Sequence, residues 1–287
     1  MIYRVYMSYN YNADNVISAI YLSMIKQLFI SFISVFLLCS FTTEDPKNLK
    51  WTGHKAYQAG EKLEYSLSYS FISAGMAFMR VEDTVMNGKK ILHLMTEGRT
   101  IGLADLIYKV RDVYESYVDP ETDMPVKAIR NIKEGNYRYY NEVIYDRDSL
   151  TVISKKSGVK PVPENILDII SAFYYARNHY FNENMKVGDV ISFDTYFSDK
   201  LFPLDIQYVG TEEVRTKFGK VRCYKFIPVT EVGRAFKSNE GMFMWITRDE
   251  NRIPVKIKFE LVVGSFVCNL ESFQGLKYPF SSIVLSK

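Results

Sequence analysis

The chain has 287 residues, of which 47% are hydrophobic, enough to build one large domain or two small ones around a buried core. Aromatic residues reach 15%, with 22 Tyr and 19 Phe, and this composition favours β-strands over helices. Charged residues of both signs are interspersed and the formal net charge is only +3. The overall charge therefore gives no indication of a nucleic-acid partner or of an anionic membrane surface.

Residues 24–43 have the pattern of a secretory signal peptide. Lys26 precedes the apolar run 28–38, and small residues follow this run before the chain becomes polar. The alternative is an uncleaved membrane anchor, but the run falls short of the ~20 apolar residues that a helix needs to cross a bilayer. We therefore expect export to the periplasm or cell envelope of a Gram-negative bacterium.

The start of the chain suggests a three-part organisation. We interpret Met24 as the true start, residues 1–23 as a mis-assigned upstream extension, and residues 44–287 as a single all-β domain. Cys39 is not expected to carry a lipid anchor, because Leu38 stands before it where lipoprotein signals usually place a small residue.

Most of the domain alternates between apolar and polar side chains, which is the period of a half-buried β-strand. In residues 137–146 this alternation places Tyr139, Asn141 and Tyr145 on one face. Asn87-Gly88 lies between two β-rich runs and predicts a hairpin with a two-residue type I′ turn. The predicted strands are 63–70, 76–86, 90–96, 110–118, 137–146, 150–155, 190–197, 204–216, 220–229, 241–247, 253–263 and 265–273.

Residues 164–181 break this period, because their apolar side chains recur at helical spacing. Pro161 and Pro163 precede this segment, Asp168 lies near its start and Arg177 near its end, as the helix dipole favours. We expect an amphipathic helix that either fills the core or acts as a lid. The predicted fold is mainly β: a single curved antiparallel sheet, from half-barrel to barrel, of ten to twelve strands with one main helix packed on it.

Sequence patterns of known catalytic and metal sites are missing. His54, His93 and His179 are isolated from one another, and the chain contains no HExxH, CxxC, GxSxG or glycine-rich phosphate loop. We therefore assign no catalytic residue, metal or cofactor. Groups that converge from distant strands would leave no such pattern, so an enzyme stays among the alternatives.

Cys223 and Cys268 are the cysteines of the expected mature domain, and each falls within a predicted strand. In an oxidising compartment such a pair is a candidate disulfide. The alternative is two buried free thiols. We favour the free thiols slightly, because strand geometry often prevents two cysteines from bridging.

The most charged predicted strand, residues 108–117, has Arg111 and Glu115 on one face. They form either a polar cluster at a ligand groove or an outward-facing ladder of ion pairs between strands. The candidate ligand-binding residues, which also include side chains of the helix and one tryptophan, are Arg111, Glu115, Phe173, Tyr174, Arg177 and Trp245.

Short segments spread over residues 55–275 carry a family resemblance. They are residues 60–65, 74–75, 110–112, 114–117, 168, 171–177, 187–189, 245–247, 249 and 252–255. Together they resemble domain-of-unknown-function family 3108, which is common among exported bacterial proteins. The resemblance implies a single domain and supplies no activity. The pattern is also similar to half-barrel carriers of lipids and lipoproteins, by analogy of fold alone.

Three functions fit this sequence. The favoured one is a non-enzymatic binding or carrier module for an apolar ligand, lipid or lipoprotein-like, since a curved sheet rich in Phe, Tyr and Met would form an apolar groove. The alternatives are an envelope assembly or structural factor and, less favoured, an envelope hydrolase. The expected partners are an apolar small molecule or lipid, or an envelope protein. Nucleic acid is not expected, and contact with a membrane is expected to be peripheral at most.

Overall fold

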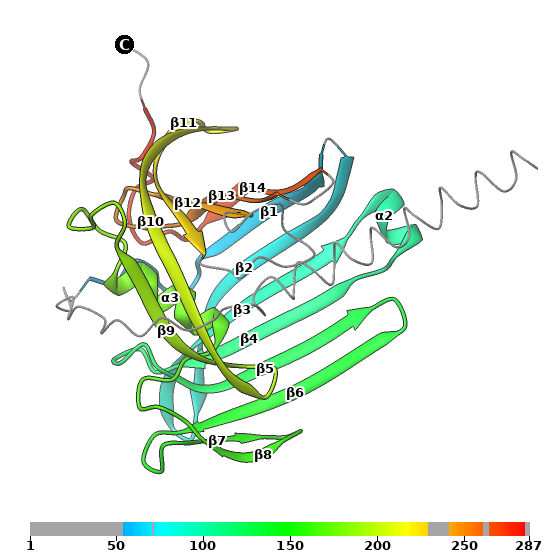
Figure 1. The fold of residues 1–287 in the computed structure, drawn as a ribbon, viewed down its shortest axis with the longest axis vertical. Coiled ribbons are helices and arrows are strands. Elements are labelled where there is room, and N and C mark those ends of the chain that lie inside the picture. Colours follow the sequence, from blue (N-terminus) through cyan, green and yellow to red (C-terminus); the bar gives the residue numbers. More distant parts are fainter. Residues whose placement is uncertain (1–53, 71, 229–240, 261–263, 285–287) are drawn as a thin grey trace, which may run out of the picture.

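The computed structural model describes residues 54–70, 72–228, 241–260 and 264–284, and the expected signal peptide and upstream extension lie outside these residues. Fourteen strands and two helices form the described part of the chain (Figure 1). The strands are β1 (Lys62–Tyr69), β2 (Ile72–Met86), β3 (Lys89–Thr100), β4 (Arg111–Val118), β5 (Pro125–Glu134), β6 (Tyr137–Asp146), β7 (Thr151–Ser154), β8 (Gly158–Pro161), β9 (Val190–Phe197), β10 (Lys200–Thr216), β11 (Gly219–Pro228), β12 (Met242–Thr247), β13 (Pro254–Glu260) and β14 (Ser265–Gln274). The helices are α2 (Gly102–Ile107) and α3 (Ile169–His179).

All fourteen strands belong to one antiparallel sheet, in the order β8-β7-β6-β5-β4-β3-β2-β1-β14-β13-β12-β11-β10-β9. The first strand pairs with the last, so two meandering arms extend from the β1–β14 seam. Figure 1 shows that the sheet curves strongly, and β8 and β9 at its two ends do not pair with each other. The predicted curved antiparallel sheet is confirmed, in its open rather than its closed form.

Local sequence accounts for most of these strands. Leu63, Tyr65 and Leu67 alternate toward the core and are each no more than 2% exposed. Asn87 and Gly88 both adopt positive φ, 52° and 77°, as the predicted type I′ turn between β2 and β3 requires. Period-two alternation therefore identified these strands because one face of each is buried.

Two strands escaped prediction for physical reasons. β5 places Arg130 and Glu134 on its inner face, and these charges break the apolar alternation that marks a strand. β8 has only four residues, all exposed, and so has no buried face to produce a pattern. The short helix α2 was missed as well, since none of its residues is buried.

The main helix begins later than residue 164. Leu167 is extended and forms a bridge with Thr195 of β9, and α3 starts only after Asp168. Pro161 ends β8 instead of opening the helix. The segment 162–189 thus leaves one edge of the sheet and reaches the other, with α3 packed against β3, β4 and β9. Of the residues described, none forms a helix long and apolar enough to cross a membrane.

Cys223 and Cys268 are both free, buried thiols. They belong to one hydrophobic cluster around β1, β13 and β14, yet they form no bridge. Burial raises the pKa of the Cys268 thiol to about 12 and that of Cys223 further, which keeps both protonated and unreactive. The disulfide alternative therefore does not describe this structure.

Candidate functional site

The N-terminus of α3 is attached to β4 through a buried aspartate. Asp168 Oδ1 accepts hydrogen bonds from the backbone N–H groups of Ile170 and Ser171, at 2.8 and 3.0 Å. Ser171 Oγ in turn accepts from the N–H of Asp168, which completes a capping box. Asp168 Oδ2 lies 2.5 Å from Ser116 Oγ on β4. Burial raises the pKa of Asp168 even though these donors favour its ionised form.

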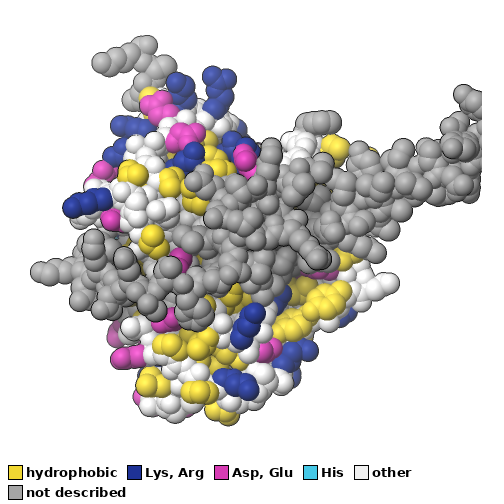
Figure 2. All heavy atoms as spheres, in the orientation of Figure 1, with side chains coloured by type: hydrophobic (Ala, Val, Ile, Leu, Met, Phe, Trp, Pro, Cys, Tyr) yellow, Lys and Arg dark blue, Asp and Glu magenta, His cyan; other side chains and the backbone are white. Residues whose placement is uncertain are grey.

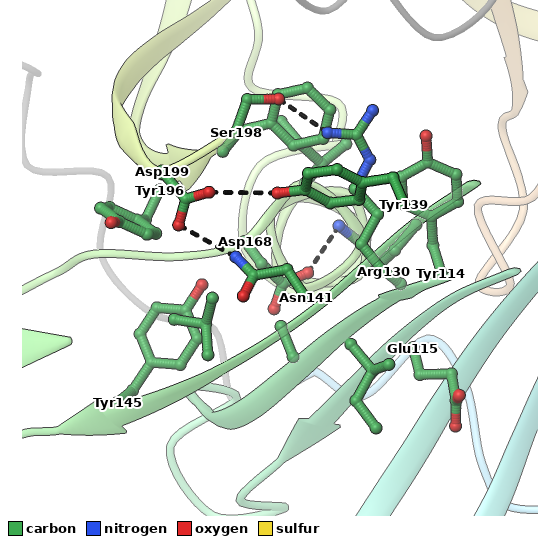
Figure 3. Close-up of a pocket in the computed structure, with 16 residues that line it drawn as sticks. Tyr114, Glu115, Arg130, Tyr139, Asn141, Tyr145, Asp168, Tyr196, Ser198 and Asp199 are labelled. Carbon is green, nitrogen blue, oxygen red and sulfur yellow. Dashed lines mark hydrogen bonds between the residues drawn. The ribbon is translucent and has the colours of Figure 1, made fainter. Parts of the chain in front are cut away.

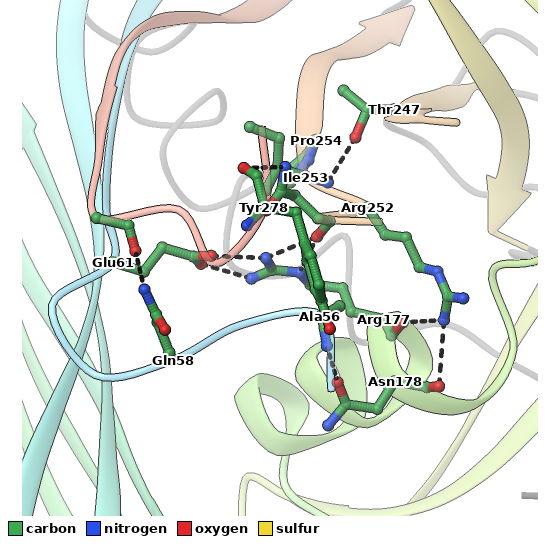
Figure 4. Close-up of polar contacts among 12 residues, drawn as sticks. Ala56, Gln58, Glu61, Arg177, Asn178, Thr247, Arg252, Ile253, Pro254 and Tyr278 are labelled. Atoms are coloured by element: carbon green, nitrogen blue, oxygen red, sulfur yellow. Dashed lines mark hydrogen bonds and ion pairs between the residues drawn. The ribbon is translucent and has the colours of Figure 1, made fainter. Parts of the chain in front are cut away.

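The C-terminal half of α3 is held by a fully buried ion pair (Figure 4). Arg177 donates two parallel hydrogen bonds to Glu61, with N–O distances of 2.6 and 2.8 Å, and both side chains are 0% exposed. The guanidinium also donates to the carbonyl of Asn251 and lies over the rings of Tyr57 and Tyr174. This arrangement joins α3, the residue directly before β1 and the β12–β13 loop.

Further polar contacts secure the same end of the helix. Arg252 Nη1 donates to the carbonyls of Arg177 and Asn178, at 2.7 and 3.1 Å (Figure 4). Asn178 Oδ1 accepts from the N–H of Ala56, and its Nδ2 donates to Asp123. Buried polar contacts fix both ends of α3. The helix could move only by breaking them, so it is better suited to hold the sheet than to act as a lid.

A cavity of about 50 Å³ lies beside this pinned helix, between the inner face of β4–β6, the first turn of α3 and the β9–β10 turn (Figure 3). Its sixteen lining residues are Tyr114, Glu115, Ala128, Ile129, Arg130, Tyr139, Asn141, Val143, Tyr145, Asp168, Ile169, Ile170, Tyr196, Phe197, Ser198 and Asp199. Tyr139, Asn141, Val143 and Tyr145 all border it, as the alternation of β6 predicts. The cavity therefore lies where the two ends of the open sheet approach each other.

One aspartate fastens the β9–β10 turn across the cavity. Asp199 accepts four side-chain hydrogen bonds from the other arm of the sheet, and we call this contact the Asp199 latch. The donors are Tyr139 Oη at 3.1 Å, Asn141 Nδ2 at 2.9 Å, Ser154 Oγ at 2.5 Å and Ser157 Oγ at 2.9 Å. Burial alone would raise the pKa of Asp199, but the four donors hold it below its ordinary value. Side chains at this turn thus supply a link between arms whose edge strands do not pair.

Arg130 is the cationic group of the cavity. Its Nη1 donates to Ser198 Oγ at 2.7 Å, and its guanidinium lies 4.6, 4.9 and 5.6 Å from the ring centroids of Phe197, Tyr139 and Tyr114. No ion pair joins it to a carboxylate within the described ranges, and there Arg130 Nε and Tyr145 Oη also have no hydrogen-bond partner. The cavity therefore combines aromatic walls with two donors that remain to be satisfied.

Replacing Asp199 with alanine is expected to lower the free energy of unfolding by about 2–4 kcal/mol, because four donors lose a charged acceptor. Amide hydrogen exchange should rise in the β9–β10 turn more than in α3. Asp199→Gly is the matched control: Asp199 has φ of 63°, so glycine removes the same carboxylate without the backbone strain of alanine. Unchanged exchange in the turn of both variants would rule out the latch.

Two of the predicted site residues, Arg111 and Glu115, lie on the outer face of β4. Arg111 pairs with Asp105 of α2, with an N–O distance of 2.7 Å. Glu115 lies beside the cavity, but its carboxylate contacts His93 at 2.8 Å and accepts from Tyr117 at 3.0 Å. Glu115 and His93 thus form one cross-strand contact on the outer face, whereas Arg111 pairs with a helix residue and not with a neighbouring strand.

Of the six predicted residues, only Glu115 is among those that line the cavity. Phe173 and Tyr174 pack inside the core with α3, and Arg177 is committed to Glu61. Trp245 is 6% exposed on β12, and its indole Nε1 donates to Glu212 Oε2 at 3.1 Å. The six candidates are therefore dispersed over the molecule, and the structure does not bring them together at one site.

Sequence reasoning missed Arg130 and Asp199. The strand that carries Arg130 was not predicted, and Asp199 follows the predicted strand 190–197 in what reads as an ordinary polar turn. The shared face of β6 was the one sequence signal that pointed to this cavity. This signal could not identify Asp199, the residue that β6 contacts across the cavity, because Asp199 lies 58 residues from Asn141 in the chain.

Comparisons with known proteins give a family and some structural likenesses. The sequence profile described as "Protein of unknown function (DUF3108)" matches residues 64–271. A β-barrel-like protein of family DUF1849 from Brucella abortus has a TM-score of 0.49 and 7% identity, over 75% of this chain and 96% of that one. A DUF1089 family protein from Pseudomonas aeruginosa has a TM-score of 0.38 and 10% identity, over 65% and 90%. No curated protein matches the sequence.

Proposed function

Since the chain belongs to the family Protein of unknown function (DUF3108), we propose that it is an exported, non-enzymatic binding protein of the bacterial cell envelope. Its ligand is an apolar chain that ends in an acidic group, such as a fatty acid or an anionic phospholipid. The ligand enters the cavity beneath the β9–β10 turn, and Arg130 binds its acidic end.

The observation that carries this proposal is the chemistry around Arg130. A guanidinium attracts carboxylate and phosphate groups through parallel hydrogen bonds, and here its Nε has no partner within the described residues. The rings of Phe197, Tyr139 and Tyr114 that surround it suit a hydrocarbon segment next to the charge. Tyr145 Oη supplies a second donor at the cavity wall.

The size of the cavity determines how a ligand enters. A volume of about 50 Å³ is far below the ~300–1,000 Å³ of pockets that enclose drug-sized ligands. An acyl chain therefore requires the β9–β10 turn to move away from β6 and β7. This movement breaks the side-chain contacts of the Asp199 latch. Because β9 is not paired with β6 or β7, the movement leaves the sheet intact.

The sequence supports the compartment. Lys26, the apolar run 28–38 and the small residues after it form the expected export signal, which precedes the domain of residues 44–287. An envelope location places the protein where acyl chains and anionic phospholipids are the abundant apolar molecules.

The test is a titration of the delipidated protein with dodecanoate, and with uncharged dodecanol as the matched probe. At a hundredfold excess over its dissociation constant, dodecanoate is expected to stabilise the fold by about 2.7 kcal/mol, measured from thermal unfolding. Dodecanol should bind at least tenfold more weakly, because it offers Arg130 no negative charge.

Arg130→Met keeps the length of the side chain and removes its charge, so it should weaken dodecanoate binding at least tenfold and leave dodecanol unaffected. Arg215→Met is the control, since Arg215 is exposed near the end of β10 and does not line the cavity. The proposal fails if neither probe shifts the melting temperature, or if the two variants bind dodecanoate equally well.

A further inference from the structure

The short helix α2 exposes large apolar side chains to a degree found nowhere else among the described residues. Leu103 is 73% exposed, Leu106 is 83% exposed and Ile107 is 47% exposed. None of the residues of α2 is buried. Figure 1 places α2 at the right of the molecule, and Figure 2 shows hydrophobic side chains below it, over the neighbouring strand ends. A gathered apolar surface of this kind marks an interaction site more often than isolated exposed side chains do.

Neighbouring turns extend this surface. Tyr137, at the start of β6, is 54% exposed, and Ile72, at the start of β2, is 47% exposed. The β5–β6 turn contacts the segment that follows α2, because the N–H of Gly135 donates to the carbonyl of Lys109 at 2.8 Å. A helix of one and a half turns gains little from its own hydrogen bonds, so burial of its apolar side chains elsewhere would stabilise it.

The charges around α2 are predominantly positive. Lys109, Lys133 and Arg138 are exposed beside it, and none of them forms an ion pair with a described residue. The nearby acidic groups are compensated or buried: Asp105 pairs with Arg111, and Glu134 is only 5% exposed. The small net charge of the whole chain conceals this local excess.

We propose that this surface, formed by Leu103, Leu106, Ile107 and Tyr137 with Lys109, Lys133 and Arg138 and here called the α2 tip, docks onto an anionic phospholipid bilayer. The leucines and isoleucine enter the acyl region, and the basic side chains contact lipid phosphates. The contact is peripheral and involves no spanning segment.

Docking at the α2 tip also orients the molecule. In an antiparallel meander, the β3–β4, β5–β6 and β7–β8 connections all lie at the same end of their arm. The β7–β8 connection holds Ser157 of the Asp199 latch. The α2 tip therefore turns the latched end of that arm toward the bilayer. The docking itself is argued from α2 alone and does not depend on the proposed ligand.

The test measures sedimentation of the full chain with vesicles of phosphatidylcholine alone or with 30% phosphatidylglycerol. Binding is expected with the anionic vesicles and should weaken at least tenfold when the salt concentration is raised, because salt screens the basic side chains. The double variant L103S/L106S should lose at least tenfold in binding. Its fold should be retained, since both side chains are mostly exposed, and thermal unfolding checks this.

The matched control is I153S/V159S. Ile153 and Val159 are 43% and 63% exposed, face each other on β7 and β8, and have exposed lysines beside them, so they form a comparable apolar and basic surface. All variants carry the same N-terminus, whose contribution to binding is therefore constant. The proposal is overturned if L103S/L106S binds like the wild type, if the control loses binding equally, or if anionic and neutral vesicles bind alike.

Discussion

Replacing Arg177 with methionine is expected to lower the free energy of unfolding by about 3–5 kcal/mol, measured by urea denaturation. Arg177 and Glu61 are 0% exposed and joined by two hydrogen bonds. Without the guanidinium, the Glu61 carboxylate stays buried without its cationic partner, and the carbonyl of Asn251 loses two donors. Both consequences destabilise the folded state and not the unfolded one.

Two controls separate this effect from a general loss of packing. The double variant E61L/R177M should recover much of the lost stability, because it removes both charges from the core. Lys217→Met removes an ion pair with Glu271 whose side chains are 52% and 38% exposed, and it should cost less than about 1 kcal/mol. Equal losses for Arg177→Met and Lys217→Met would contradict the assigned role of the buried pair.

Stability is expected to fall as the pH rises from 5 to 8, and Glu134→Gln should flatten this dependence. Burial, and then the neighbouring Asp112 carboxyl, raise the pKa of Glu134 to about 8, and burial raises the pKa of Asp112 as well. The folded chain therefore retains a proton that the unfolded chain releases near pH 4.5. Between these two pKa values the unfolded state binds fewer protons, so the free energy of unfolding decreases with pH.

The size of the effect follows from the same linkage. One pKa unit between folded and unfolded states corresponds to about 1.4 kcal/mol, so the wild type should lose at least about 2 kcal/mol more than Glu134→Gln between pH 5 and 8. Urea denaturation at several pH values measures this difference. Glu121→Gln, in an exposed turn, should keep the wild-type slope. A slope for Glu134→Gln equal to that of the wild type would contradict the assignment of the retained proton to Glu134.

Much of the fold follows from local pattern. Alternation identifies strands wherever one face is buried, and Asn87-Gly88 identifies its turn because both residues tolerate positive φ. The pattern does not reveal β5, because its inner face carries the charged residues Arg130 and Glu134 where an apolar residue would be expected. A strand with polar residues on its inward face has the sequence pattern of a loop, and only the positions of their hydrogen-bond partners distinguish the two.

The candidate site was less accessible to sequence reasoning than the fold. The motif residues that carry the family resemblance, Glu61, Asp168 and Arg177 among them, hold α3 against the sheet and do not converge on a ligand. Charge in a strand drew attention to Arg111 and Glu115, which are satisfied on the outer face. The residues around the cavity, Arg130 and Asp199, carry no local signal because each is defined by a distant partner.

The sequence alone determined most of the secondary structure of this protein: its period-two strands, its main helix, and which side of those strands is buried. β5, β8 and α2 are the exceptions, because charge on the inner face or the lack of a buried face removes the pattern. Tertiary structure decided which strands meet, because alternation reports a buried face and not its neighbour. β1 pairs with β14 at the far end of the chain, and Glu61 meets Arg177 across 116 residues. The Asp199 latch and the cavity beneath it form because the pairing of β1 with β14 and the curvature of the sheet bring its two arms together. No local interaction within either arm specifies that contact.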